Sequence, residues 1–207
     1  MHSRIVALIL FSLAGAAAAQ VGTSTGLLDA NSATEAELRA APGVDAAVAA
    51  KIVASRPFAS ARVFDELLAA TLGEPQREQL YGRLFVTINL NTAARAEILL
   101  IPGITDRLAH EFEEYRPYTS LEQFRREIGK YVPATEVARL EQYVFVPMNL
   151  NNAPAAAFLT IPGLTQRMAH EFEEYRPYTS VEQFRREIGK YVDAKEVARL
   201  ERYLVIE

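Results

Sequence analysis

Apolar residues recur along the chain at the three- and four-residue spacing of short amphipathic helices. The pattern is clearest in residues 89–148, where an extended lead-in is followed by a helix predicted over residues 94–100. Pro102-Gly103 ends this helix, because the residue before proline avoids the helical region and glycine accepts the positive φ of a helix end. The pattern predicts short helices separated by sharp turns, with few strands.

Three more helices are predicted in the same stretch. One begins at Thr105, a good N-cap, and ends at Arg116-Pro117. The next begins with a capping-box pattern at residues 120–123 and ends at Gly129. The last covers residues 134–145, with valine and leucine on one face. Residues 89–148 therefore have the pattern of a four-helix unit.

This unit is written three times, with a period of 60 residues. Between residues 105–132 and 165–192 only three of 28 positions differ, whereas residues 29–88 have drifted much further. We predict an all-α fold of three tandem four-helix units, at residues 29–88, 89–148 and 149–207. Because the joints between them are short and apolar, we expect one stiff, rod-like or curved body. The positions in step are Asn31, Asn91 and Asn151; Pro42-Gly43, Pro102-Gly103 and Pro162-Gly163; Arg56-Pro57, Arg116-Pro117 and Arg176-Pro177; and Phe64, Phe124 and Phe184.

The first nineteen residues have the pattern of an export signal. Arg4 supplies a positive start, an apolar stretch follows, and three alanines precede Gln20. The apolar run is shorter than the roughly 20 residues that a membrane-spanning helix needs. We predict a cleaved signal peptide over residues 1–19 and a periplasmic, bacterial location with a possible membrane association. A retained N-terminal anchor is the alternative.

The composition narrows the classes of function. A formal net charge of −4, from 22 Lys+Arg and 26 Asp+Glu, disfavours a polyanion binder, because such proteins need basic residues to displace counterions. The absence of cysteine excludes disulfides and thiolate metal sites. No Ser/His/Asp set, pocket-forming carboxylate pair or phosphate loop is found. The sequence therefore predicts no enzyme and no cofactor.

One histidine pattern is a candidate for metal binding. His110 and Glu114 lie four residues apart, as do their twins His170 and Glu174, and such a pair could hold a metal weakly. The second histidine of a metalloprotease helix is missing. A solvated helix face is the favoured interpretation, so no metal site is predicted.

The string Asn-Leu-Asn-Thr-Ala…Ile-Pro-Gly-Ile at residues 89–104 resembles the opening of helix-hairpin-helix domains of the bacterial competence DNA-receptor type. The strings that begin at residues 29 and 149 match as well, and residues 118–124 look like the second hairpin of the same domains. The resemblance covers about residues 29–207 and implies that each unit is a doubled helix-hairpin-helix. The turns that it assigns are Pro42, Gly43, Asp45, Pro102, Gly103, Thr105, Pro162, Gly163 and Thr165.

The hairpins depart from the DNA-binding members of that family. There the turn reads Gly-apolar-Gly, and its backbone N–H groups hold a phosphate. Here Asp45, Thr105 and Thr165 replace the second glycine, and their oxygens would accept the same N–H groups. The fold also resembles protein-binding members, namely the lumenal extrinsic subunit of photosystem II and parts of type II secretion minor pseudopilins. An exported, acidic, glycine-poor chain is more similar to these.

Two repeated surface patterns are candidates for binding. Tyr-Arg-Pro-Tyr predicts a protein contact, since tyrosine and arginine often anchor interfaces; packing between the helices is the alternative. For the basic clusters a mixed-charge face with paired glutamates is the favoured interpretation, and contact with DNA is the alternative. The protein-interaction candidates are Tyr115, Arg116, Tyr118, Tyr175, Arg176 and Tyr178. The DNA-binding candidates are Arg125, Arg126, Lys130, Arg185, Arg186 and Lys190.

Together these patterns predict a non-catalytic exported scaffold or binding protein. It would be an extrinsic periplasmic subunit of a membrane-bound complex, for example a photosynthetic one, and would act through protein–protein contacts. Protein partners are expected and nucleic acid is disfavoured. The alternatives are a periplasmic DNA-binding protein of the competence type without sequence specificity, and a secretion-system component.

Overall fold

The computed structural model describes residues 20–207, and this part of the chain is mainly helical, with twelve helices and six strands of two residues each. The predicted signal peptide, residues 1–19, lies outside the described residues. Within residues 20–207 no helix is long and apolar enough to cross a membrane. The prediction of a mainly α protein is confirmed.

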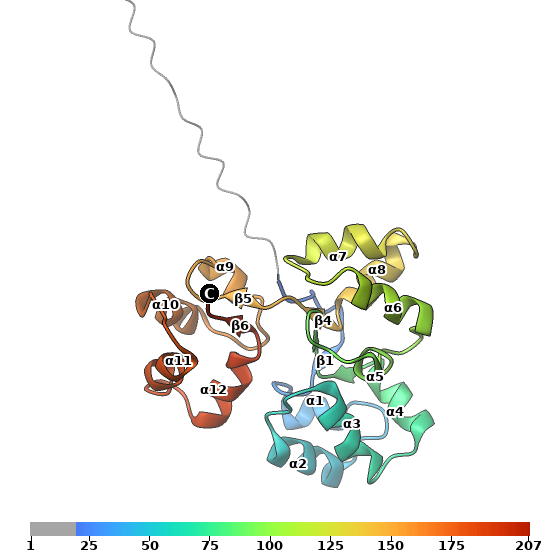
Figure 1. Cartoon of the computed structure of the whole chain (residues 1–207). Coiled ribbons are helices and arrows are strands. Elements are labelled where there is room, and N and C mark those ends of the chain that lie inside the picture. Colours follow the sequence, from blue (N-terminus) through green and yellow to red (C-terminus); the bar gives the residue numbers. More distant parts are fainter. Residues whose placement is uncertain (1–19) are drawn as a thin grey trace, which may run out of the picture.

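The order strand, four helices, strand occurs three times along the described chain (Figure 1). We call the three stretches the first, second and third segments. The first segment comprises β1 (Leu28–Asp29), α1 (Glu35–Arg39), α2 (Ala46–Ser55), α3 (Ala61–Ala69), α4 (Glu74–Tyr81) and β2 (Leu84–Phe85). The second comprises β3 (Ile88–Asn89), α5 (Arg95–Ile98), α6 (Asp106–Glu114), α7 (Leu121–Ile128), α8 (Ala134–Glu141) and β4 (Val144–Phe145). The third comprises β5 (Met148–Asn149), α9 (Ala155–Phe158), α10 (Gln166–Glu174), α11 (Val181–Ile188), α12 (Ala194–Glu201) and β6 (Leu204–Val205).

In each segment the two ends of the chain meet in a two-stranded sheet. The first strand pairs in parallel with the last strand of the same segment, as Leu28 does with Leu84 and Ile88 with Val144. Only the first strand of a segment was expected, as an extended lead-in. The helix predicted over residues 134–145 ends at Glu141 instead, and Val144 and Phe145 form β4. Sequence patterns do not show pairing between two-residue strands almost sixty residues apart, because each strand is too short to display an alternation.

The repeated asparagine and arginine hold the segment together from inside. The Asn31 amide donates to the carbonyl of Phe58 at 3.1 Å and accepts the Phe58 N–H at 2.7 Å. Arg56 donates from Nε and Nη2 to the carbonyls of Ala30 and Ala33, both at 2.7 Å. The same contacts recur 60 and 120 residues later. Without these side chains, backbone groups in the interior would lose their partners, which costs about 1–3 kcal/mol each.

The apolar core is not divided equally among the segments. The first and second segments share one continuous core. The third has a core of its own, which Val21 and Phe145 join. Figure 1 shows the third segment to one side of the other two.

The third segment also contacts the first. Arg202, just after α12, donates to the carbonyls of Ala59 at 3.0 Å and Thr87 at 2.9 Å. The hydroxyls of Thr87 and Tyr203 lie 3.1 Å apart. The expected stiff array is therefore not an extended rod, because its last segment contacts its first.

Candidate functional site

The three predicted hairpin turns have one shared geometry. Gly43, Gly103 and Gly163 all have φ of 74°, a region that residues with a Cβ rarely adopt. The Thr105 hydroxyl accepts the Leu108 N–H at 3.2 Å at the start of α6, and Asp45 and Thr165 cap α2 and α10 in the same way. One N–H group at each helix start is therefore already bound by the chain's own side chain.

Two of these turns have neighbours from another segment. Residues 99–104 line a cleft of about 350 Å³ together with Asp65, Glu74, Arg77 and Glu78 from the first segment, and Arg77 pairs with Asp65 at 2.8 Å. A Cβ built on Gly163 would lie 3.7 Å from the Ser32 side chain. Mixed charge lies beside the second turn, where a Cβ built on Gly103 would lie 3.7 Å from the Arg139 guanidinium, and a packed neighbour lies beside the third. Both restrict what could bind the turn backbone itself.

The predicted protein-interaction anchors need a correction. Tyr118 and Tyr178 are only 2 % exposed, and burial raises the pKa of both hydroxyls. The guanidinium groups of Arg116 and Arg176 donate hydrogen bonds to backbone carbonyls of their own segment. These four side chains form the interior of the fold and do not present a surface to a partner. Tyr115 and Tyr175 are half-buried.

The predicted basic clusters are largely neutralised by neighbouring glutamates. Glu127 pairs with both Lys130 and Arg126, and these contacts, Lys130 first, hold the pKa of Glu127 below its usual range. Arg125 pairs with Glu141 on the next helix. Their twins Arg185, Arg186 and Lys190 pair in the same way with Glu201 and Glu187.

The histidine pattern does not gather metal ligands. His110 Nδ1 lies 3.3 Å from a guanidinium nitrogen of Arg95, and His170 lies 3.6 Å from Glu174. Residues 20–207 contain no group of three or more histidine or carboxylate side chains placed to hold a metal ion.

A tyrosine pair that sequence reasoning overlooked is built identically in the second and third segments. The hydroxyls of Tyr115 and Tyr131 lie 2.9 Å apart, and the Lys130 amine lies 4.9 Å from the centre of the Tyr115 ring. Tyr175, Tyr191 and Lys190 repeat both distances. The signal in the sequence was Gly-Lys-Tyr, which recurs at the 60-residue period and whose tyrosine lies sixteen residues after the tyrosine of each Tyr-Arg-Pro.

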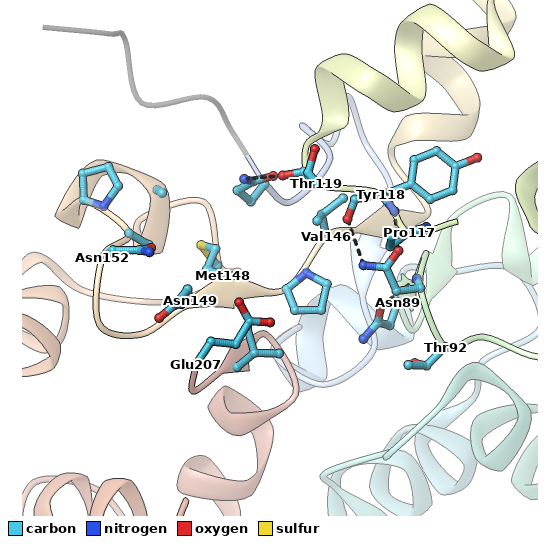
Figure 2. Close-up of a pocket in the computed structure, with 17 residues that line it drawn as sticks. Asn89, Thr92, Pro117, Tyr118, Thr119, Val146, Met148, Asn149, Asn152 and Glu207 are labelled. Atoms are coloured by element: carbon cyan, nitrogen blue, oxygen red, sulfur yellow. Dashed lines mark hydrogen bonds between the residues drawn. The ribbon is translucent and has the colours of Figure 1, made fainter. Parts of the chain in front are cut away.

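A cleft of about 620 Å³ lies between the second and third segments (Figure 2). Amide and hydroxyl side chains line it, among them Asn89, Thr92, Asn149 and Asn152, together with the carboxylate of Glu207. Its described lining contains no lysine or arginine. Neutral donors and acceptors beside a carboxylate do not favour an anionic ligand.

No family model matches the chain, and no solved structure matches it. The chain is similar to proteins named endonuclease/exonuclease/phosphatase family domain-containing protein 1. It is 28 % identical to the Xenopus laevis protein over 130 residues, which are 46 % of this chain and 23 % of that protein. It is 28 % identical to the Bos taurus protein over 138 residues (46 % and 24 %) and 29 % identical to the Rattus norvegicus protein over 161 residues (75 % and 24 %).

The chain thus spans about a quarter of the length of these relatives. Their names contradict the function predicted from the sequence. They belong to a class named for nucleases and phosphatases, and none is named as a scaffold, an extrinsic subunit or a secretion component. The prediction of a non-catalytic scaffold subunit was therefore wrong.

Proposed function

We propose that the chain acts in the hydrolysis of phosphodiester bonds as the part that holds the nucleic-acid strand. The observation that carries this proposal is the similarity to the three nuclease- and phosphatase-named proteins, which in one case covers 75 % of this chain. Because three quarters of each relative lie outside the match, the hydrolytic step itself is not assigned to residues of this chain.

The proposal includes the finer architecture, three doubled helix-hairpin-helix units at residues 29–88, 89–148 and 149–207. The supporting observations are the shared turn φ, the shared caps and the shared asparagine and arginine contacts. The competence-type domains that the sequence resembles include DNA-binding members, which is consistent with a nucleic-acid ligand.

The proposed contact is through exposed side chains next to the turns. Arg107 and Arg167 are the second residues of α6 and α10, and both are exposed. A cation at a helix N-terminus opposes the helix dipole by about 0.3–1 kcal/mol, and a bound phosphate would relieve that repulsion. The caps on Thr105 and Thr165 and the formal charge of −4 weaken the attraction, so binding is expected near 10⁻⁴–10⁻⁶ M and strongly salt-dependent.

Fluorescence anisotropy with labelled oligonucleotides tests this proposal. The full chain should bind at about 50 mM salt and lose most of its affinity at about 200 mM. The double variant Arg107→Gln/Arg167→Gln should weaken binding, whereas Arg62→Gln in the first segment changes the net charge by a single unit in an exposed pair with Glu66 and should have a small effect. Absence of binding to both single strands and duplexes at low salt would exclude the proposed function.

Export is a separate proposal, supported by the signal-like residues 1–19. Expression in a bacterial host should give a secreted or periplasmic product whose N-terminal sequence begins near Gln20. A product that keeps Met1 and stays in the cytoplasm would contradict it.

A further inference from the structure

The second and third segments each expose one aromatic ring. Tyr131 is 38 % and Tyr191 is 37 % exposed, and the other strongly exposed large apolar side chains of the described residues are valines and leucines. Each ring is fixed in place, since its hydroxyl lies 2.9 Å from that of Tyr115 or Tyr175. A preset ring loses little conformational entropy when a ligand stacks on it.

Cations lie close to these tyrosine pairs, and the carboxylates of Glu111 and Glu171 lie beside the hydroxyls of Tyr131 and Tyr191. Arg167 lies 5.8 Å from the centre of the Tyr191 ring, and Lys190 lies 4.9 Å from the centre of the adjoining Tyr175 ring. Since Arg167 is also the second residue of α10, it connects the ring to the hairpin turn. Glu187 is shared by Lys190 and Arg186, so its charge is already compensated. The surface combines an aromatic face with cations, which is the pairing that recognises a base and its phosphate.

The fold does not require the tyrosine pair. In the first segment the equivalent positions hold Ser55 and Thr71, and Ala70 stands where the lysine would be. The first segment nevertheless has the same four helices and the same closing strands. An exposed aromatic ring that packing does not need, kept with its lysine in two of three segments, points to a ligand.

We propose that Tyr131 and Tyr191 are stacking platforms for unpaired nucleobases, with Lys130, Lys190 and Arg167 holding the neighbouring phosphates. The inference rests on the proposed nucleic-acid function and narrows its ligand to single-stranded nucleic acid. A duplex keeps its bases stacked on each other and offers these rings no free base face.

The test uses the full chain and a labelled thymidine oligonucleotide of about 20 nucleotides at low salt. The double variant Tyr131→Ala/Tyr191→Ala should bind about tenfold more weakly or worse, because base–aromatic stacking accounts for a factor of this size per base. Tyr131→Phe/Tyr191→Phe keeps the rings and should bind nearly as well as the wild type. Thr71→Ala, at the matching position of the first segment, should have no effect. The chain has no tryptophan and nine tyrosines, so strand-induced quenching of tyrosine emission that is smaller in the alanine variant than in the wild type reports stacking on Tyr131 and Tyr191.

The outcomes separate the inference from the proposed function. If the chain binds no oligonucleotide, both the proposed nucleic-acid function and the stacking inference are wrong. The stacking inference is wrong if the alanine variant still binds single strands as the wild type does, or if the chain binds duplex more tightly than single strand. Either result would be compatible with the proposed nucleic-acid function. If the alanine variant loses self-association in sedimentation and keeps its affinity for DNA, the rings serve a protein contact and the inference is wrong. Circular dichroism and melting of each variant confirm that the comparison is made between folded proteins.

Discussion

The joint between the first and second segments and the joint between the second and third are built from the same aromatic contact in different surroundings. At the first joint, the rings of Phe85 and Tyr143 are 5.1 Å apart, and the Tyr143 hydroxyl donates to the carbonyl of Tyr81 at 3.2 Å. At the second joint, the rings of Phe145 and Tyr203 are 4.6 Å apart. The first joint lies inside a shared core, whereas the second connects two cores.

A few residues account for the difference. The Glu97 carboxylate accepts the Ala61 N–H at 2.8 Å and so ties α5 to the start of α3, but its repeat equivalent is Ala157. At the second joint, residues 20–22 lie against β4 instead: Gly22 donates to the carbonyl of Val144 at 3.1 Å, and Val146 donates to that of Gln20 at 2.8 Å. Nearly identical sequences specify the interiors of the second and third segments, and positions that diverged, such as Glu97 and Ala157, specify how segments meet.

The largest expected effect comes from removing one buried aromatic ring from each core in turn. Phe112→Ala and Phe172→Ala remove equivalent, fully buried rings, and each should lower the free energy of unfolding of its core by about 3–5 kcal/mol. Because the first core is shared, Phe112→Ala should reduce hydrogen-exchange protection across residues 28–145. Phe172→Ala should do so only across residues 148–205.

Hydrogen exchange read by mass spectrometry gives the measurement, with the wild type as reference. Equal loss of protection along the whole chain in both variants would show that the two cores unfold together. The two joints would then differ in their packing, but the two cores would not differ in stability.

The next largest effect concerns the carboxylate that only the first joint has. Glu97→Ala makes the first joint resemble the second and removes a charged acceptor at a helix start, which should cost about 1–3 kcal/mol. Chemical denaturation measures the decrease in the free energy of unfolding. Glu97→Gln, which keeps an acceptor oxygen without the charge, should lose less. An unchanged unfolding midpoint for Glu97→Ala would show that this contact does not stabilise the joint.

Much of the helical pattern could be predicted from the sequence, and the arrangement of the segments could not. Pro102-Gly103, Thr105 and Ser120 mark helix ends through local chemistry, so a single sequence reveals them. The contact of Arg202 with Ala59 depends on how three segments pack, and no local pattern encodes it. The interface prediction failed at Tyr118 for a similar reason, because a repeated aromatic residue has the same pattern in a core as on a surface.

A smaller effect is expected at the helix caps, which all three segments share. Thr105→Ala removes the oxygen that accepts the Leu108 N–H and should destabilise the second segment by about 1 kcal/mol. Thr105→Ser keeps the hydroxyl and should be close to neutral. Asp45→Ala should cost a similar amount in the first segment. Thermal unfolding of these variants checks the set. A melting curve for Thr105→Ala that coincides with the wild type would contradict the role of this cap.

The smallest expected effect is a difference in acid sensitivity between segments. Lys130, and after it Arg126, hold the pKa of Glu127 below its usual 4.5, and Lys190 with Arg186 does the same for Glu187. A depressed folded pKa contributes stability that is present above the unfolded value and is lost as the pH falls through the folded value. The first segment has Leu67 and Ala70 at these positions and lacks the contribution. Carboxyl titration by NMR should therefore show the pKa of Glu127 returning toward 4.5 in Lys130→Gln, while that of Glu187 stays low. Lys130→Gln should also flatten the dependence of stability on pH below about 4.5, whereas an unchanged Glu127 titration would show that the lysine does not act on this carboxylate.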